Sequence, residues 1–478
     1  MSPFLTFSLL YGCFGLATEV PVPVDSGDGG ETGAVDTDEP DEDTGCVQMG
    51  VKTTMVEWEL PPDFPEGTFE TAYDSSPTSD PAWGLADLDG NGRTDILVTR
   101  NDVVGDPNLG TTSWLYLSNT GSKFRSEADS WSLPGGYPEG TFATPYDINL
   151  ASPAWVLADL DGDGHNDLVI TEDRASSVTG LGTSLWVTYE NEGDGFSNSL
   201  KTWSLPPGFS EGALSSMADN NPASPTWALV DLNADGRSDF VVTHDDSTEG
   251  LGTTSWRVYL NTGTGFSSSA SEWLLPEGFP ERTFDRVYDD DSLAAPSWGL
   301  YDIDGNGRTD LVVTRNDDGE VEGVGTKTWV YYSNTGSRFR TEDQKWALPP
   351  SYPTNTFETL SDTNSATPTW ALADLDRDQL PDLVVTRDDD ADIDELGSSR
   401  WQLYSGGEEG FSEENTAWPL PKEFEALSFQ AIYDDQTGSP AWSLIDLEGD
   451  DLLDIIVTED GSDTTGTTTW RLYPGKCR

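Results

Sequence analysis

The sequence is poor in basic residues and has no long apolar run. Its 478 residues include 24 Lys and Arg against 87 Asp and Glu, which gives a formal net charge of −63. A surface of that sign repels nucleic acid and anionic lipid headgroups, so we expect neither as a partner. No stretch of about 20 apolar residues is present, so we expect no membrane-spanning helix.

Cysteine is also scarce, with only Cys13, Cys46 and Cys477 in the chain. Two of them bracket the long central part of the sequence and the third stands near the start. This usage is typical of an oxidising compartment and indicates one disulfide.

What the sequence does contain is a repeat of about 72 residues. An acidic motif recurs six times, beginning at Asp87, Asp159, Asp231, Asp302, Asp374 and Asp446. Each copy carries four short alternating segments, exemplified by 153–161 (strand A), 310–314 (strand B), 254–259 (strand C) and 131–134 (strand D). Such a period, with no helical pattern, predicts an all-β, six-bladed β-propeller over 46–478 with four antiparallel strands per blade.

The two ends of the array are complementary. It begins with a lone strand D at 58–61 and finishes after a strand C at 470–473. We therefore predict that the N-terminal strand completes the C-terminal blade and removes an open edge. Alignment with the Asn-Thr-Gly turn at 119–121 places Cys46 and Cys477 at the two ends of an equivalent turn, which predicts a disulfide between them. By the chain-entropy model this bond would stabilise the fold by about 4–5 kcal/mol.

The repeated motif, Asp-x-Asp/Asn-x-Asp/Asn-Gly-x-x-Asp, has the chemistry of a cation site. Oxygens from positions 1, 3, 5 and 9, with the backbone carbonyl of position 7, can surround a hard cation such as Ca²⁺. We call the copies loops one to six and expect about four to six Ca²⁺ ions. The predicted ligands are Asp87, Asp89, Asn91, Arg93 and Asp95; Asp159, Asp161, Asp163, His165 and Asp167; Asp231, Asn233, Asp235, Arg237 and Asp239; Asp302, Asp304, Asn306, Arg308 and Asp310; Asp374, Asp376, Asp378 and Asp382; and Asp446, Glu448, Asp450 and Asp454.

The six loops differ in their glycines. Loop five has Arg377 and Gln379 where loop one has Gly90 and Gly92, and loop six has Glu448 at position 3. Glycine permits the left-handed backbone that such a turn needs. We therefore expect good sites in loops one to four, a weaker site in loop six and the weakest in loop five.

The motif is not an EF-hand, because position 12 of loop one is Val98 and a strand follows. An acidic loop followed by a strand, repeated at a propeller-like period over 46–478, resembles the FG-GAP/VCBS repeat family. That resemblance implies calcium-dependent blades and extracellular adhesion or ligand binding, and it identifies no ligand.

All 18 tryptophans fall at three repeat positions, one each in strands A, C and D. The main interpretation is that they pack between neighbouring blades. A second interpretation places Trp83, Trp114 and Trp131 on the face opposite the acidic loops, with Arg100 and Asp102, as a possible ligand face. Aromatic rings beside polar groups suit sugars, so a multivalent lectin is the alternative to a protein-binding adhesion scaffold.

The sequence gives little support for catalysis. The two histidines are His165, inside loop two, and His244, and neither a nucleophile elbow, an HExxH motif nor a phosphate loop is present. We expect a protein that is not an enzyme. A polysaccharide lyase or hydrolase working through paired carboxylates is the less favoured alternative.

The N-terminal segment has the features of export. Residues 1–12 form an apolar signal, and 10–13 resemble a bacterial lipobox with Cys13 as the lipidated residue; plain secretion is the alternative. Residues 13–45 are acidic and poor in apolar side chains, which predicts a disordered linker. We expect a monomer that is secreted or anchored by lipid to a bacterial envelope membrane, with an extracellular protein or glycan as partner.

Overall fold

The computed structural model describes most of the repeat array. The described residues are 47–72, 81–101, 108–144, 152–217, 225–287, 296–317, 322–360, 368–389, 395–432, 440–462 and 464–477. The predicted signal peptide (1–12), Cys13, the linker (13–45), Cys46 and Asp102 lie outside them. Within these ranges every regular element is a strand, and none of the segments is a helix long and apolar enough to cross a membrane.

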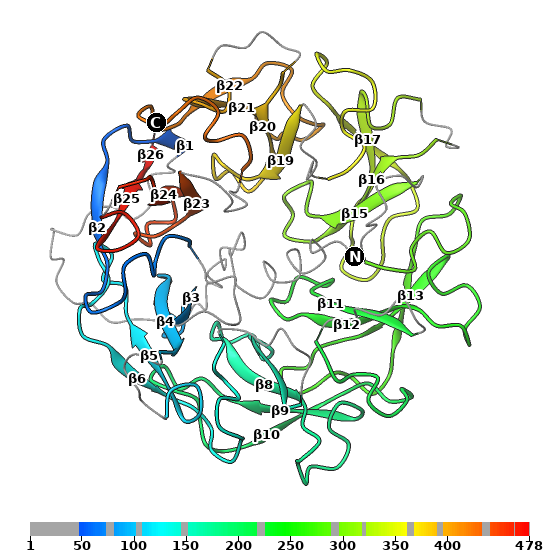
Figure 1. Ribbon diagram of the computed structural model, residues 1–478. Helices are drawn as coiled ribbons and strands as arrows, with labels where there is room; N and C mark the ends of the chain where they lie inside the picture. Colours follow the sequence, from blue (N-terminus) through cyan, green and yellow to red (C-terminus); the bar gives the residue numbers. More distant parts are fainter. Residues whose placement is uncertain are drawn as a thin grey trace, which may run out of the picture.

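Six four-stranded antiparallel sheets stand around a central axis, which confirms the predicted six-bladed β-propeller (Figure 1). Blades one to three are β3 (Ala82–Ala86), β4 (Asp95–Arg100), β5 (Ser113–Leu117) and β6 (Asp129–Ser132); β7 (Ala154–Ala158), β8 (Asp167–Glu172), β9 (Leu185–Tyr189) and β10 (Lys201–Ser204); and β11 (Thr226–Val230), β12 (Asp239–His244), β13 (Ser255–Tyr259) and β14 (Ser271–Leu274). Blades four and five are β15 (Ser297–Tyr301), β16 (Asp310–Arg315), β17 (Thr328–Tyr332) and β18 (Gln344–Ala347); and β19 (Thr369–Ala373), β20 (Asp382–Arg387), β21 (Arg400–Tyr404) and β22 (Thr416–Pro419).

Blade six is assembled from both ends of the chain, as predicted. Its strands are β23 (Ala441–Ile445), β24 (Asp454–Glu459), β25 (Thr469–Tyr473) and β2 (Val56–Glu59). Trp58 of β2 lies opposite Trp470 of β25, in the register that Trp131 and Trp114 adopt in blade one. The closure therefore reproduces an ordinary blade and leaves no unpaired edge at the junction.

The chain ends differ from prediction beyond that strand. Instead of the expected turn, β1 (Gln48–Val51) and β26 (Gly475–Cys477) form a two-stranded antiparallel sheet in which Gln48 lies opposite Cys477. Gly50 permits this arrangement: its φ is 107°, and a Cβ there would lie 2.5 Å from Pro419 Cδ of blade five. The Cys46–Cys477 disulfide stays a prediction, because Cys46 lies outside the described residues.

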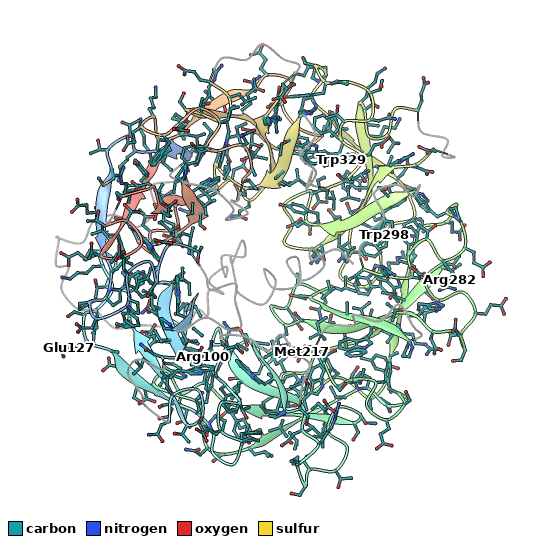
Figure 2. The ribbon with its side chains drawn as sticks, in the orientation of Figure 1. Arg100, Glu127, Met217, Arg282, Trp298 and Trp329 are labelled. Atoms are coloured by element: carbon teal, nitrogen blue, oxygen red, sulfur yellow. The ribbon has the colours of Figure 1, made fainter. Side chains whose placement is uncertain are left out.

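The hydrophobic core is divided into six clusters, and each cluster joins two neighbouring blades. In the first, Phe196 of blade two meets Trp114 and Trp131 of blade one edge-on, with ring centroids 5.8 Å apart in both pairs. Figure 2 shows Trp298 and Trp329 within the ring and Arg282 and Glu127 at its outer rim. The main interpretation of the tryptophans, packing between blades, is confirmed.

One junction of the ring departs from this pattern. Between blades five and six the phenylalanine is replaced by Val51 of β1, which is buried in the cluster shared by those blades. With no phenylalanine edge to receive them, Trp401 and Trp418 stack on each other, at 5.2 Å and an interplanar angle of 13°. The N-terminal segment thus supplies a core residue as well as a strand.

Candidate metal sites in the acidic loops

Each acidic loop connects the first and second strands of a blade, and loop one shows how its sequence shapes it. The Asp87 carboxylate accepts hydrogen bonds from the backbone N–H groups of Gly90 and Gly92, at 2.9 and 2.8 Å. Asn91 Oδ1 accepts one from Arg93 N at 2.9 Å. Both glycines have positive φ, 69° and 80°, the conformation that glycine adopts without strain. The first strand therefore ends just before the loop's first aspartate, at Ala86 in blade one and Ala158 in blade two, not within the loop as predicted for 153–161.

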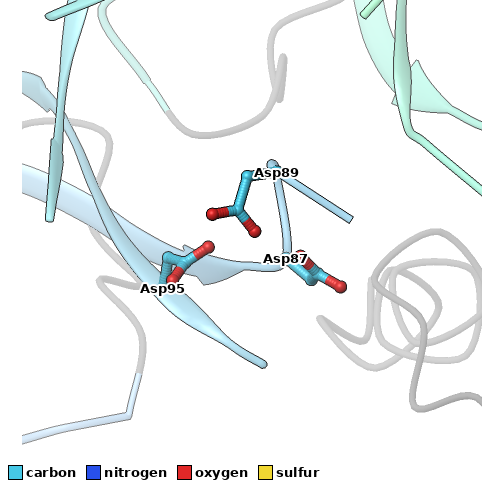
Figure 3. A group of neighbouring side chains, drawn as sticks. All are labelled: Asp87, Asp89 and Asp95. Atoms are coloured by element: carbon cyan, nitrogen blue, oxygen red, sulfur yellow. The ribbon is translucent and has the colours of Figure 1, made fainter. Parts of the chain in front are cut away.

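Carboxylates from distant positions of a loop meet at the start of its second strand. Figure 3 shows Asp87, Asp89 and Asp95 gathered there. In each of four loops, three carboxylate oxygens lie within 4.8 Å of one another, an arrangement that could hold a metal ion: Asp87, Asp89 and Asp95; Asp159, Asp161 and Asp163; Asp302, Asp304 and Asp310; and Asp374, Asp376 and Asp382. Like charges this close repel one another unless a cation or protons lie between them.

The aspartate at position 9 is the most deeply buried acidic residue of each loop. Asp95, Asp239, Asp310, Asp382 and Asp454 are 0% exposed. Beside Asp310 in loop four, Asp304 Oδ1 is buried with no hydrogen-bond partner. An acceptor left unpaired in a protein interior requires an explanation, and a bound cation supplies one because it needs oxygens and no hydrogen.

Burial shifts the titration of these same groups. It raises the pKa of the position-9 carboxyl to about 7 in Asp95, Asp167, Asp239 and Asp454, and to about 8 in Asp310 and Asp382. Neighbouring carboxylates raise the pKa further, whereas a backbone N–H bound to each group lowers it. Without a positive charge, the folded loop therefore disfavours ionisation of its own ligands.

Loop five keeps the shape of loop one in spite of its missing glycines. Arg377 and Gln379 adopt φ values of 65° and 70°, close to the 69° and 80° of Gly90 and Gly92. Their N–H groups bond to the two Asp374 oxygens at 2.6 and 3.0 Å, as in loop one. Left-handed backbone costs roughly 1–2 kcal/mol per non-glycine residue, yet the loop keeps its three converging carboxylates. Its rank among the calcium sites stays a prediction.

In loops three and six, no such group of three carboxylate oxygens lies within 4.8 Å of one another. Loop three has the amide Asn233 at position 3, so only Asp231, Asp235 and Asp239 could contribute carboxylates. Its Ala234 has a φ of 59°, again the conformation of the missing glycine. In loop six Asp446 still accepts bonds from Gly449 and Asp451, at 2.8 and 2.7 Å. Both loops keep the backbone shape. The position-7 carbonyls of Arg93, His165, Arg237 and Arg308 stay predicted ligands.

Several residues around the loops were missed in the sequence. The Tyr116 hydroxyl donates to Asp89 at 2.5 Å and lies 3.0 Å from Asp95 Oδ2, and Ser333 donates to Asp304 at 3.0 Å. The Asn of each Asn-Thr-Gly turn was recognised only as a turn signal. In the structure its backbone N–H binds the position-9 aspartate; Asn119 N lies 2.6 Å from Asp95 Oδ1. The recurrence of that Asn 22 to 24 residues after the position-9 aspartate was the available signal.

The possible ligand face needs a correction. Trp83, Trp114 and Trp131 are at most 2% exposed, so their rings offer no platform to a sugar. Trp114 Nε1 donates to Phe142 O at 2.7 Å, which places the ring beneath the connection to the next blade. Arg100 is partly exposed on this side and Asp102 lies outside the described residues. The tryptophans do lie on the side opposite the acidic loops, but as core.

Comparison with known proteins supports the fold. No family model matches the chain, and a search of the curated proteins gives no match. Among solved structures, it is similar to a chain of the Photorhabdus luminescens Tc holotoxin pore (16% identity, TM-score 0.50), covering 90% of this chain and 15% of that one. It also matches an Agrocybe aegerita lectin that recognises non-reducing terminal N-acetylglucosamine (16% identity, TM-score 0.41, 84% and 80% covered). A polysaccharide lyase matches at 11% identity and a TM-score of 0.29, with 90% and 99% covered. Of these three, the toxin chain reaches a TM-score of 0.50, and at 16% identity that likeness shows the fold alone.

Proposed function

We propose that this protein is a calcium-binding β-propeller of the cell surface or extracellular space that serves as an adhesion or ligand-binding scaffold. The observation that carries the calcium assignment is the unpartnered, buried Oδ1 of Asp304, beside the converging carboxylates of Asp302 and Asp310. A bound cation satisfies that oxygen and removes the repulsion among the three charges.

The donor set favours Ca²⁺ over other common cations. The loops offer carboxylate, amide and carbonyl oxygens and, apart from His165 in loop two, whose ring packs over Gly90 of loop one, no nitrogen or sulfur ligand. Such oxygen-only sets suit hard cations, and an irregular loop that can supply six to eight oxygens suits Ca²⁺ better than the strict octahedron of Mg²⁺. When bound, the ion supplies positive charge that holds the loop closed, and the side chains of the loop orient and retain it.

The scaffold role follows from how the two faces differ. The loop face is occupied by candidate cation sites and their supporting turns. The opposite face carries the long connections between blades and repeated ion pairs at the ends of the second strands, such as Arg315–Asp317 at 2.8 Å and Arg387–Asp389 at 2.5 Å. Connections on a rigid scaffold are where binding residues concentrate, so we place the partner there. With the tryptophan rings buried, a protein partner is favoured over a glycan.

The calcium assignment is tested by counting ions bound to the full-length protein after equilibrium dialysis, using elemental analysis. Asp302→Asn removes one carboxylate from loop four and should lose one ion per chain. Glu342→Gln, an exposed acid away from the loops, removes the same charge and should lose none. Equal counts for both variants, or no calcium in the unaltered protein, would overturn the assignment.

Export and anchoring belong to the same proposal. A lipid on Cys13 would hold the propeller at the envelope membrane, whereas cleavage alone would release it. Metabolic labelling with a radioactive fatty acid separates the two: label lost on Cys13→Ser supports anchoring, and an unlabelled, released protein supports plain secretion.

A further inference from the structure

The acidic loops are physically connected to one another around the ring. The Asn191 side chain of blade two donates from one Nδ2 to Asn166 O of its own loop, at 3.2 Å, and to Leu88 O of loop one, at 2.8 Å. Its backbone N–H binds Asp167 Oδ1 at 2.9 Å. One buried residue thus holds a candidate metal ligand of loop two and the backbone of loop one.

The same bridge recurs at other junctions. Asn119 joins loops one and six through Thr94 O and Leu447 O, at 3.0 and 2.8 Å. Asn261 and Asn334 make the corresponding pairs of bonds between loops two and three and between loops three and four. Repetition at four junctions shows that the contact belongs to the architecture and not to one blade.

The remaining two junctions are treated differently. In blade six the turn residue is Gly475, and the bridge is made by Gln48 of β1. The Gln48 side chain donates to Leu453 O of loop six at 2.7 Å and accepts from Leu453 N at 2.9 Å. The backbone N–H of Gln48 donates to Asp376 O of loop five at 3.3 Å. In blade five Gly406 occupies the turn and has no side chain, so the junction between loops four and five lacks the amide bridge.

A second contact joins adjacent loops. The position-7 side chain of one loop packs over the position-4 residue of the preceding loop. A Cβ added to Gly162 of loop two would lie 2.7 Å from Arg237 Cγ of loop three, and one added to Gly449 of loop six would lie 2.6 Å from Arg93 Cγ of loop one. Leu380 of loop five makes the same approach to Gly305 of loop four. A change of shape in one loop therefore displaces its neighbour.

We propose that the loops load cations cooperatively along the ring, with the turn amides transmitting occupancy from loop to loop and the weakest link between loops four and five. This inference rests on the proposed calcium binding. An ion that draws in Asp167 fixes the position of Asn191 and, through it, the backbone of loop one next to Asp89. The buried oxygen without a partner, Asp304 Oδ1, lies in loop four, one of the loops so connected.

The test is a calorimetric Ca²⁺ titration of the metal-free full-length protein. The unaltered protein should bind with a Hill coefficient above one. Asn191→Ala, which removes a bridge and no ligand, should lower that coefficient and weaken loading of the adjoining loops by at least about five-fold, the lower end for coupled sites, with the number of ions unchanged. Glu192→Ala, an exposed neighbour in the same turn, should titrate as the unaltered protein does.

Independent binding of several ions in the unaltered protein, or an unchanged coefficient in Asn191→Ala, would overturn the coupling and leave the proposed function intact. Absence of any bound calcium would overturn both the coupling and the proposed function.

A second measurement, hydrogen exchange of the backbone amides, shows whether the variant is misfolded. Asp159→Asn, which disables loop two, should raise exchange in loop one as well, and should no longer do so when combined with Asn191→Ala. Equal exchange in loop one in all variants counts against the proposal.

Discussion

Raising the pH should destabilise the metal-free protein, which is the reverse of ordinary acid denaturation. Burial raises the pKa of Asp95 from 3.8 to about 7, and that of Asp310 to about 8. A carboxyl whose pKa is higher in the folded chain binds its proton more tightly there than in the unfolded chain. Folding is therefore favoured by these protons below pH ~4, and that contribution is lost as the pH rises through about 7 to 8.

The magnitude follows from the size of the shift. Each unit of pKa difference corresponds to about 1.4 kcal/mol, so one such carboxyl disfavours the folded, metal-free protein by about 4 kcal/mol at pH 8. Six of them would total roughly 25 kcal/mol, more than the whole stability of a typical domain, so the loops should relax before the full penalty develops. We expect a loss of at least about 4 kcal/mol between pH 5 and 8.

The assay is urea unfolding followed by the fluorescence of the buried tryptophans, at several pH values, on protein freed of metal by chelation and dialysis. With saturating Ca²⁺ the loss should disappear, because the cation takes the place of the protons. Asp310→Asn, which removes one titrating group, should flatten the metal-free profile, and Glu342→Gln should not. A metal-free stability that is constant or rises from pH 5 to 8 would refute the reasoning.

Two matched pairs of variants test the packing of the loops and blades. Gly162→Ala and Gly164→Ala both place a side chain at positive φ, but only Gly162 faces Arg237, whereas nothing lies within 4 Å of a Cβ at Gly164. Gly162→Ala should therefore lower the free energy of unfolding by about 1 kcal/mol more, and equal losses in urea titrations would contradict the contact. Trp114→Phe leaves the buried Phe142 carbonyl without its donor, whereas Trp131 Nε1 has no hydrogen-bond partner to lose. Trp114→Phe should cost about 1–2 kcal/mol more than Trp131→Phe in thermal or urea unfolding, and the opposite order would show that ring volume alone decides.

The repeat made the fold predictable from the sequence, because every blade carries the same strands and the same three tryptophans. Closure by the N-terminal strand could be read from Trp58, which keeps the register of the other strand-D tryptophans. Val51 also keeps the repeat spacing, because it lies seven residues before Trp58 as Phe124 lies seven before Trp131, but its change from phenylalanine hides the match. The role of Gln48 could not be predicted, since Gln48 supplies the amide of the missing Asn from a different distance to the same tryptophan.

The acidic loops lie where the sequence places them, between the first and second strands of each blade, but the glycine pattern did not predict their shape. Loop five lacks both glycines, and the sequence alone gives no means of knowing that Arg377 and Gln379 accept positive φ values. Hydrogen bonds to Asp374 and the fixed ends of β19 and β20 hold that shape, and tertiary structure thereby overrides a local preference. Exposure of the tryptophans was similarly undetermined, because strand direction gives the face of a side chain but not what covers it.

The closure of blade six also determines when the protein can finish folding during synthesis. Gln48 and its partner Leu453 are 405 residues apart in the chain. At 5–20 residues per second, Gln48 waits roughly 20–80 s for the partner that is made 405 residues later. During that interval blades one to five can form from local contacts while β2 and the open side of blade five remain uncovered. Closure of the ring is thus the joining of two segments that leave the ribosome far apart in time.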